Sequence, residues 1–328
     1  MRFTVTVDTE EEWDWDSGWP TGRPQVTNID ALPRFQNLCS RYGIRPTYFV
    51  DLAVLDECRA RQTVLEVASQ PGVEIGMHIH PWNTPPIMDA RSTTARDTFL
   101  HNLRDDLITA KLSKVYRRFN ELGLRPTSFR GGRYSSGGRV TEFLRRHSFW
   151  ADASVLPLTT WPDDGAPDYR GRGLLPNRLP PAEQGQPPLW EIPLTLAFNR
   201  RPLGFWRRCY ELIENSWLGK LHLIGIAERL RLIRRIWLNF ESPLGEHMLD
   251  MLPVAQRLGL QHVCFTVHSS SLMAGKGPYT RTAGDEQRIF GLIERVFAKL
   301  AETAEFIPVT TTELAQQLEG EYHACARN

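Results

Sequence analysis

Stretches with the hydrophobic pattern of strands alternate along this chain with stretches of helical spacing, and this alternation constrains the fold more than any other feature. Strand patterns are predicted at residues 3–8, 46–50, 73–80, 128–130, 149–154, 190–198, 262–267 and 305–309. Helical patterns are predicted at residues 30–42, 64–68, 93–122, 138–147, 245–258 and 285–303. Such alternation with short connections predicts a parallel sheet covered by helices, open or closed into a barrel. In these folds the functional side chains lie at the C-terminal ends of the strands.

One region interrupts the alternation. Residues 157–188 are rich in Pro, Gly and Asp, and residues 204–240 have a basic, aromatic pattern with helical spacing. Strand patterns that belong to the sheet lie on both sides of this region. The whole chain, residues 1–328, is therefore predicted to form one domain that contains an insertion at residues 157–240.

Charge and composition argue against several classes of protein. A formal net charge of +1 gives no reason to expect a nucleic-acid partner. No apolar run approaches the roughly 20 residues needed to cross a membrane, and the first residues enter a strand pattern without an apolar targeting segment. The five cysteines are odd in number and lack a CxxC pair, which is typical of free thiols in a reducing compartment. We therefore expect a cytoplasmic protein.

The first predicted strand ends in acidic residues, Thr-Val-Asp8-Thr-Glu10-Glu-Glu. Side chains repeat every second residue along a strand, so Asp8 and Glu10 point the same way at the strand's end. Two like charges so placed repel each other unless a cation, a proton or an arginine neutralises them. The alternative is a solvated acidic loop.

A second motif, Gly-Met-His78-Ile-His80-Pro, ends another predicted strand. Histidines at i and i+2 of an extended chain share a face, so both imidazoles can bind one ion. Two histidines and one carboxylate leave positions open for water, which is the composition of a catalytic zinc site or a similar divalent site. We predict one divalent ion, with zinc favoured, bound by His78, His80 and a carboxylate at Glu10 or Asp8.

Three further motifs fall at strand ends. In Phe-Arg130-Gly-Gly-Arg-Tyr134 an arginine can pair with a carboxylate while the glycines let the backbone approach a ligand, although a tight turn with exposed arginines has the same pattern. Asp152 interrupts an apolar strand and needs a buried partner, either a histidine or an arginine. His268 follows an apolar strand that delivers it to the same edge of the sheet.

In this order the motifs resemble those of the polysaccharide deacetylases, also called the NodB-homology family. The extended forms His-Pro-Trp-Asn-Thr-Pro-Pro and His-Ser-Ser-Ser-Leu-Met-Ala-Gly resemble a divergent bacterial branch often found with surface-polysaccharide genes. The resemblance covers residues 3–154 and 241–312. It implies an α/β fold, a distorted (β/α)7 barrel, and an enzyme that removes acetyl groups from N-acetylated, sometimes O-acetylated, sugars.

The resemblance also implies a role for each motif residue. Asp8 would be the catalytic base, held in place by Arg130, and the backbone N–H of Tyr134 would face the oxyanion. Asp152 would orient His268, the general acid.

The metal ligands that the resemblance implies are Glu10, His78 and His80. The chain departs from the family here in two ways. The family usually has adjacent aspartates where this chain has Asp-Thr-Glu, so Glu10 must act as a ligand from one residue further on. The usual His-x-x-x-His is shortened to His-x-His.

Two other functions remain open from the sequence. Some relatives with altered motifs lack a catalytic metal and open cyclic amides or imides, so a metal-independent amidase is one alternative. A barrel that binds carbohydrate without catalysis is the other. Metal content separates the first alternative from a deacetylase, and hydrolysis of an acetylated amino sugar separates both enzymes from a binding protein.

The region 199–240 carries nine Arg or Lys residues against three Glu, and its apolar residues have helical spacing in two runs. We predict two amphipathic helices here. Their basic faces are either the solvated side of helices that cap the barrel, or a contact with an anionic membrane or a phosphate-bearing lipid-linked sugar.

Overall fold

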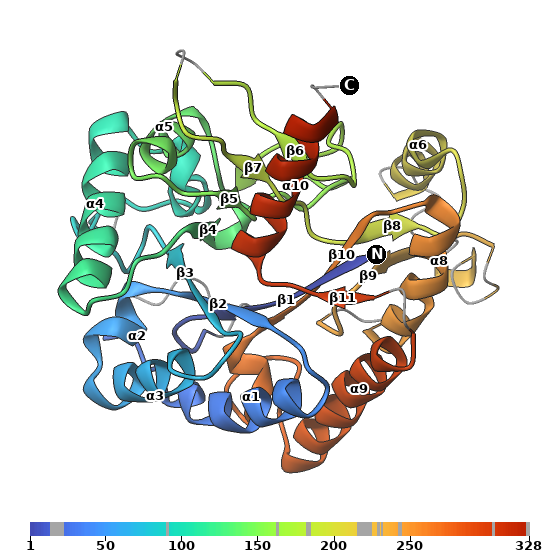
Figure 1. Ribbon diagram of the computed structural model, residues 1–328, viewed down its shortest axis with the longest axis horizontal. Helices are drawn as coiled ribbons and strands as arrows, with labels where there is room; N and C mark the ends of the chain where they lie inside the picture. Colours follow the sequence, from blue (N-terminus) through green and yellow to red (C-terminus); the bar gives the residue numbers. More distant parts are fainter. Residues whose placement is uncertain are drawn as a thin grey trace.

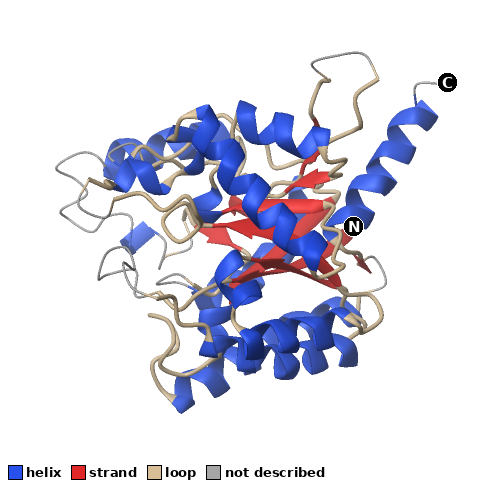
Figure 2. Ribbon diagram, turned by 90° about the vertical axis from the view of Figure 1, so that its left-hand side faces the viewer, coloured by secondary structure: helices blue, strands red, loops and turns tan. Residues whose placement is uncertain are grey.

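In the computed structural model a nine-stranded sheet is covered by helices on both sides, and both termini lie away from the acidic end of the first strand (Figure 1, Figure 2). The structure describes residues 1–13, 23–89, 92–161, 164–181, 185–214, 225–227, 230, 232–241, 245–303 and 306–325, and every structural statement below concerns these residues.

The large sheet contains β1 (Arg2–Thr9), β2 (Pro46–Val50), β3 (Glu74–Ile79), β4 (Ser128–Gly131), β5 (Ala151–Asp152), β6 (Asn177–Arg178), β7 (Trp190–Glu191), β10 (His262–His268) and β11 (Ile307–Pro308). A second sheet contains β8 (Leu196–Phe198) and β9 (Arg235–Trp237). The α-helices are α1 (Leu32–Arg41), α2 (Leu52–Asp56), α3 (Cys58–Ala68), α4 (Asp105–Glu121), α5 (Gly138–Arg146), α6 (Leu203–Glu214), α8 (Met251–Leu258), α9 (Ala283–Ala301) and α10 (Thr311–Cys325). Short 3-10 helices are η1 (Thr27–Ala31), η2 (Ala95–Thr98), η3 (Leu100–Asn102), η4 (Gly132–Tyr134), η7 (Gly245–Asp250) and η8 (Ser269–Leu272).

The strand order of the large sheet is β10-β1-β2-β3-β4-β5-β7-β6, and β11 pairs with the start of β1. All of these pairs are parallel except the one between β6 and β7, so the C-terminal ends of the central strands meet at one edge. The small sheet lies beside β10, because the Leu238 carbonyl accepts a hydrogen bond from Thr266 while the Leu238 N–H donates to Thr195. The result is a half-barrel with surrounding helices, which confirms the predicted fold class.

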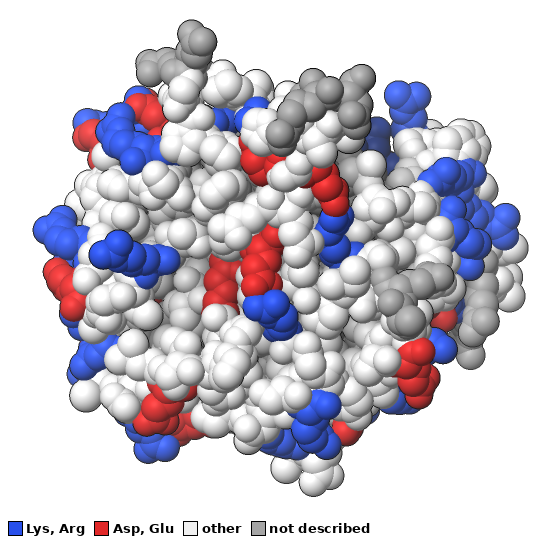
Figure 3. Space-filling view, viewed as in Figure 1, with Lys and Arg blue, Asp and Glu red and all other residues white. Residues whose placement is uncertain are grey.

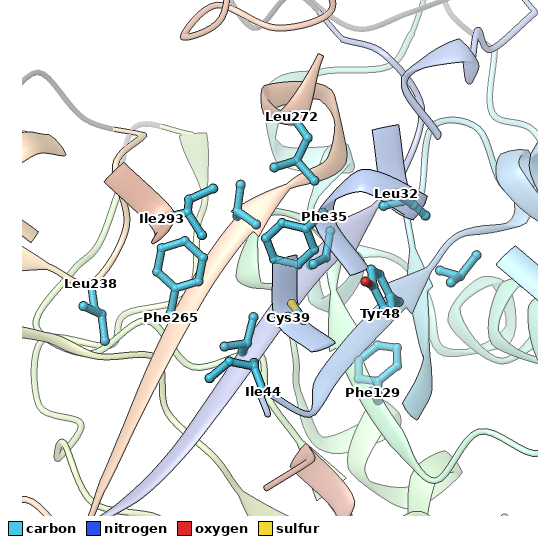
Figure 4. Packing of buried hydrophobic residues seen from close by; sticks show 14 of the residues in the cluster. Leu32, Phe35, Cys39, Ile44, Tyr48, Phe129, Leu238, Phe265, Leu272 and Ile293 are labelled. Carbon is cyan, nitrogen blue, oxygen red and sulfur yellow. The ribbon is translucent and has the colours of Figure 1, made fainter. Parts of the chain in front are cut away.

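The core lies between the sheet and the helices that follow it (Figure 4). Phe35 of α1, Tyr48 of β2 and Phe265 of β10 are each fully buried there. In β1 the apolar face of Phe3, Val5 and Val7 packs into this core as the alternation predicts, while Thr4, Thr6 and Asp8 are also buried on the opposite face. A parallel strand that is buried on both faces can carry functional polar groups only where partners satisfy them. All five cysteines are free thiols, as expected.

Two element boundaries differ from the sequence prediction for identifiable reasons. The helix predicted at residues 93–122 begins with 3-10 turns, and α4 starts only at Asp105, where two acidic residues favour the positive end of a helix. The strand predicted at residues 190–198 is divided into β7 and β8. Pro193 lies between them and has no N–H to donate to a ladder.

The second helix predicted in the insertion is wrong. Helix α6 forms as expected, but Arg235–Trp237 is the strand β9, which pairs antiparallel with β8 in the register Phe198↔Arg235. Burial alternates along this strand, with Arg235 exposed and Ile236 buried. The side chains therefore repeat every two residues, as in a strand, and not with the helical spacing that the sequence predicts. The predicted basic and aromatic pattern of this region also includes Trp217, Lys220, Arg229 and Arg231, which lie outside the described residues.

A buried lysine fixes the loop that follows β3. The Lys111 side chain of α4 is fully buried, and its ammonium donates hydrogen bonds of 2.6–2.7 Å to the carbonyl oxygens of Pro81, Thr84 and Pro86. Burial lowers the pKa of Lys111 to about 8. Three fixed carbonyls hold the loop against α4, and this loop begins directly after His80.

Replacing Lys111 with methionine should lower the free energy of unfolding by about 3 kcal/mol or more, because bonds from a charged donor are lost and buried carbonyls are left unpaired. The measurement is urea denaturation followed by circular dichroism. Lys114→Met, an exposed position on the same helix, is the matched control and should change stability by less than about 0.5 kcal/mol. Equal effects of the two substitutions would contradict the role given to the buried ammonium.

Candidate active site

The parallel register brings the predicted motifs to one place. Asp8 on β1 is the register partner of His268 on β10, and His78 on β3 is the partner of Arg130 on β4. These strand ends open into a pocket of about 460 Å³. Its walls include the carboxylates Asp8, Glu10 and Glu241, the imidazoles His78, His80 and His268, and the aromatic rings Trp13, Tyr134, Trp161, Trp237 and Tyr279.

Three buried side chains form a triangle of ligand atoms. Oε2 of Glu10 lies 3.1 Å from Nε2 of His78 and 3.1 Å from Nε2 of His80, and the two Nε2 atoms are also 3.1 Å apart. A tetrahedral zinc ion with bonds of about 2.0–2.1 Å separates its ligand atoms by about 3.3 Å. The triangle therefore has the size of one face of such a coordination shell.

The other nitrogen of each histidine determines which proton it carries. Nδ1 of His78 lies 2.8 Å from the carbonyl oxygen of Arg130, and Nδ1 of His80 lies 2.9 Å from a Glu11 carboxylate oxygen. Both partners are acceptors, so both Nδ1 atoms donate. In the neutral imidazoles the two Nε2 lone pairs then face each other and the Glu10 carboxylate. A cation at the centre of the triangle resolves this conflict, and the donor set fits a divalent metal.

Asn28 of η1 and Ser269 of η8 fix the backbone of Glu10 through hydrogen bonds. The amide of Asn28 donates to the Glu10 carbonyl at 3.0 Å and to the Ser269 hydroxyl at 2.8 Å. The Glu10 N–H donates to the same hydroxyl at 3.1 Å. Burial opposes ionisation of Glu10, but the neighbouring imidazoles outweigh it and lower the pKa of this carboxyl. Glu10 is therefore a fixed carboxylate.

A second layer of acidic groups, which the sequence did not indicate, supports His80. Glu11 is fully buried and also accepts a hydrogen bond of 2.9 Å from the indole N–H of Trp82, whose ring stacks on His80 with centroids 4.2 Å apart. Burial and the Glu11 charge raise the pKa of Asp51, which keeps a proton beside Glu11. Glu11, Asp51 and His80 also lie close enough together to hold an ion, but Glu11 and Asp51 already accept hydrogen bonds from Trp82 and Asn83, so we assign them the role of supporting the triangle.

Asp8 is held by a buried arginine, as the sequence predicts. Nη1 of Arg130 lies 2.7 Å from Oδ1 of Asp8, and neither side chain has more than a few per cent of its surface exposed. The same Nη1 atom contacts the hydroxyls of Thr6 and Thr266, and Nε donates to the Ala153 carbonyl. Oδ2 of Asp8 points toward His268, with Nε2 at 3.7 Å.

The loop after β4 comes very close to the triangle formed by Glu10, His78 and His80. A Cβ atom on Gly132 would lie 2.2 Å from the His80 ring, so only glycine fits at this position. Tyr134 follows with a left-handed φ of 58°, and its carbonyl accepts a hydrogen bond of 2.8 Å from the hydroxyl of Tyr169. These constraints fix the Tyr134 backbone and side chain at the pocket wall.

The predicted partner of His268 is wrong. Asp152 accepts hydrogen bonds from the hydroxyls of Ser136 and Ser154, both at 2.5 Å, and does not contact His268. Glu241 takes this place, with Oε2 2.6 Å from Nδ1 of His268 and Oε1 accepting the His268 backbone N–H at 3.0 Å. The physical reason is that Asp152 is on β5, across the sheet from β10, whereas Glu241 lies on the segment that runs alongside β10.

The Glu241 carboxylate changes the chemistry of His268. Burial alone would lower the pKa of this imidazole, but the charges of Glu241, Glu10 and Asp8 raise it to about 10. His268 is therefore a cation at neutral pH. Polar and apolar residues alternate in Leu238-Asn-Phe-Glu241, which is a sequence signal for this position, but the helical pattern predicted for residues 204–240 ends just before Glu241 and hides the alternation.

No protein-family model matches the sequence, and no curated protein matches it. Two solved structures are similar in fold. A protein assigned as a polysaccharide deacetylase from Mycobacterium smegmatis is 12% identical, with a TM-score of 0.52 over 90% of this chain and 79% of that chain. A protein assigned as a polysaccharide deacetylase from Pseudomonas aeruginosa PAO1 is 15% identical, with a TM-score of 0.51 over 96% and 89%. The chain thus has the fold of the polysaccharide deacetylases, as the resemblance of its motifs predicted.

Replacing Glu241 with glutamine should lower the pKa of His268 from about 10 toward the ordinary value of about 6.5, because the imidazolium loses its adjacent negative charge. An NMR titration of the His268 ring protons measures this change directly. Asp152→Asn removes a buried carboxylate that does not touch His268, and it should leave the titration unchanged. If Asp152→Asn lowered the pKa of His268 more than Glu241→Gln does, Asp152 would be the partner of His268, as the sequence predicts.

Proposed function

We propose that the protein is a metal-dependent N-deacetylase that hydrolyses the acetamido group of an N-acetylated sugar in a glycan or glycan precursor. The observation that carries this proposal is the triangle of Glu10, His78 and His80, with Asp8 and His268 beside it in one pocket. An amide hydrolase needs an electrophilic centre, a base for water and an acid for the leaving nitrogen. This pocket contains candidates for all three.

Glu10, His78 and His80 would hold one divalent ion, with zinc favoured by the two imidazole ligands. Such an ion polarises the acetamido carbonyl and lowers the pKa of a bound water toward about 7. The protein's own contribution is to keep the three ligand atoms in place, through the Arg130 carbonyl on His78 and the Glu11 carboxylate on His80.

Asp8 is the proposed base. It accepts a proton from the water that attacks the acetamido carbon, and Arg130 keeps the carboxylate oriented before the reaction. The backbone N–H of Tyr134 is the proposed donor to the oxyanion that forms on the carbonyl oxygen.

His268 is the proposed acid, and Glu241 is its positioning residue. The carbon–nitrogen bond breaks as Nε2 of His268 gives its proton to the sugar nitrogen, which leaves as an amine while the acetyl group leaves as acetate. A cationic imidazole with a pKa of about 10 holds that proton at neutral pH. Activity should therefore fall at alkaline pH, as His268 loses its proton.

The second candidate is a metal-independent amidase or cyclic-imide hydrolase. One observation favours it: burial lowers the pKa of His80, but the carboxylates of Glu11 and Glu10 outweigh burial and raise it. A proton on His80 would separate the facing lone pairs without a metal. A carbohydrate-binding barrel without catalysis remains the third candidate.

Metal content and acetate release distinguish the three candidates. We expect one divalent ion per chain, acetate release from at least one acetylated amino sugar, and loss of both in His80→Ala. His323→Ala, at an exposed histidine on α10, is the control and should change neither. Asp8→Asn should keep the metal and lower turnover by about 10²–10⁴-fold. Hydrolysis that persists without metal would favour the second candidate, and absence of hydrolysis on every substrate would favour the third.

We further propose that the surface around α6 makes peripheral contact with an anionic membrane on the cytoplasmic side. None of the described helices is apolar over a length that would span a bilayer. Five of the ten large apolar side chains that are exposed in the described part of the chain lie here: Phe205, Leu212, Ile226, Leu230 and Leu232. Lys and Arg also gather at the edge of the molecule that α6 and α8 occupy (Figure 3).

The outer face of α6 combines both properties. Phe205, Arg208 and Leu212 are spaced at i, i+3 and i+7, and all three are exposed, whereas Tyr210 on the other face is buried. Apolar side chains flanked by arginine suit the interface of an anionic bilayer. Arg234, expected to belong to the basic face, instead is buried and paired with Asp250 at 2.6 Å.

Co-sedimentation with vesicles tests this contact. Binding should increase with the fraction of anionic lipid, weaken with salt, and drop in the double variant Arg208→Glu/Leu212→Gln. Arg146→Glu/Leu175→Gln makes the same changes at exposed positions elsewhere and should bind like the parental protein. Equal sedimentation with neutral and anionic vesicles would reject the membrane contact and leave α6 with a purely structural role.

A further inference from the structure

Two hydrogen-bond donors in the pocket have no acceptor within the described protein. They are the hydroxyl of Tyr134 and the indole N–H of Trp237, both buried and both part of the pocket lining. Buried polar groups in native proteins almost always have a partner, and each exception needs an explanation. Both residues line the pocket, so an oxygen atom of a bound ligand could supply the missing acceptor.

The two donors form one unit. Their rings meet edge to face, with centroids 6.0 Å apart and an angle of 69° between the planes. Trp237 is fixed by its pairing with Leu196 across the small sheet, and the carbonyl of Tyr134 is fixed by the Tyr169 hydroxyl. A substrate that binds them therefore meets donors that are already in position, which reduces the entropy cost of binding.

Both members of the pair are neutral hydrogen-bond donors. Burial, together with the charges of Asp8 and Glu241, raises the pKa of Tyr134, so its hydroxyl stays protonated. The indole N–H of Trp237 is a donor only. Phosphate groups are typically bound by arginine or lysine.

Arg133, the one arginine or lysine in the described pocket lining, is already engaged. Its guanidinium lies 2.7 Å from the Asp164 carboxylate and 2.6 Å from the Thr98 hydroxyl, and it covers the Phe99 ring. Apart from the His268 imidazolium, which is paired with Glu241, the described pocket wall therefore offers neutral donors to a ligand and no uncommitted arginine or lysine.

We propose that the Tyr134 hydroxyl and the Trp237 indole N–H form a recognition subsite that donates hydrogen bonds to hydroxyl oxygens of an uncharged acetamido sugar ring. This inference rests on the proposed function and adds to it a substrate class for the pocket: a neutral sugar ring, with any phosphate of the substrate outside. It also gives the insertion a role in recognition, because Trp237 lies within residues 157–240.

Tyr134→Phe and Trp237→Phe test the subsite in the metal-loaded protein. Tyr134→Phe keeps the ring and the backbone N–H, so it removes the hydroxyl alone. With N-acetylglucosamine as the probe, each substitution should raise the Kd and the KM by about 2- to 10-fold while kcat changes little, since one neutral hydrogen bond is lost. Tyr48→Phe, which removes a buried hydroxyl bound to Gln36 in the core, should change neither.

Deoxy analogues identify the contacted oxygen. One of the 3-, 4- and 6-deoxy analogues lacks the hydroxyl that the subsite contacts. The parental protein should bind this analogue as weakly as the variant does, so the substitution should not weaken its binding further. If all analogues lose affinity equally on substitution, or if Kd and KM do not change, the subsite is rejected. A fall in kcat at constant KM would also reject it, because the hydroxyl would then act on the reacting carbonyl.

Fluorescence of the pocket tryptophans measures binding separately from hydrolysis. Binding of N-acetylglucosamine that is weakened by both substitutions, without acetate release from any substrate, would support the subsite and reject the deacetylase. Acetate release with parental Kd and KM in both variants would reject only the subsite. Absence of both binding and hydrolysis would reject the two proposals together.

Discussion

The ion pair between Arg130 and Asp8 is the interaction on which the arrangement of the site depends. The guanidinium is fully buried and contacts acceptors on β1, on β10 and directly after β5, so one side chain from β4 joins four strands at the floor of the pocket. A buried pair of this kind is costly to break, because removal of either partner leaves a charge without compensation. The ion pair therefore both stabilises this edge of the sheet and orients the Asp8 carboxylate.

Around this pair, the pocket is built from buried charges that need one another. Glu241 is buried against the His268 imidazolium, and His268 is cationic because Glu241, Glu10 and Asp8 surround it. The facing nitrogens of His78 and His80 are 3.1 Å apart, and either a bound cation or a proton on His80 would relieve the contact between their lone pairs. A site with this balance of charge suits a reaction in which protons move between fixed groups.

The sequence predicted the parts of the site that follow from local geometry. Asp8, His78, His80, Arg130 and His268 end strands, and the rule that parallel strands meet at one edge is sufficient to place them together. The partner of His268 could not be predicted in this way, because it depends on how the insertion returns to the sheet. Asp152 and Glu241 are both acidic residues at the end of an apolar run, and only the long-range pairing of β9 decides between them. Local spacing also misassigned residues 235–237, where helical and alternating patterns overlap in a short segment.

The segment from Trp237 to Glu241 joins recognition to chemistry. The chain bends at residues 238–240, directly after β9, and the side-chain amide of Asn239 donates to the Glu241 carboxylate at 3.0 Å. One end of the segment thus contributes a donor to the pocket wall, and the other end sets the charge of His268. Because Glu10, His78 and His80 lie at or directly after the ends of β1 and β3, outside the insertion, we expect changes in the insertion to alter the wall of the pocket while these three side chains stay in place.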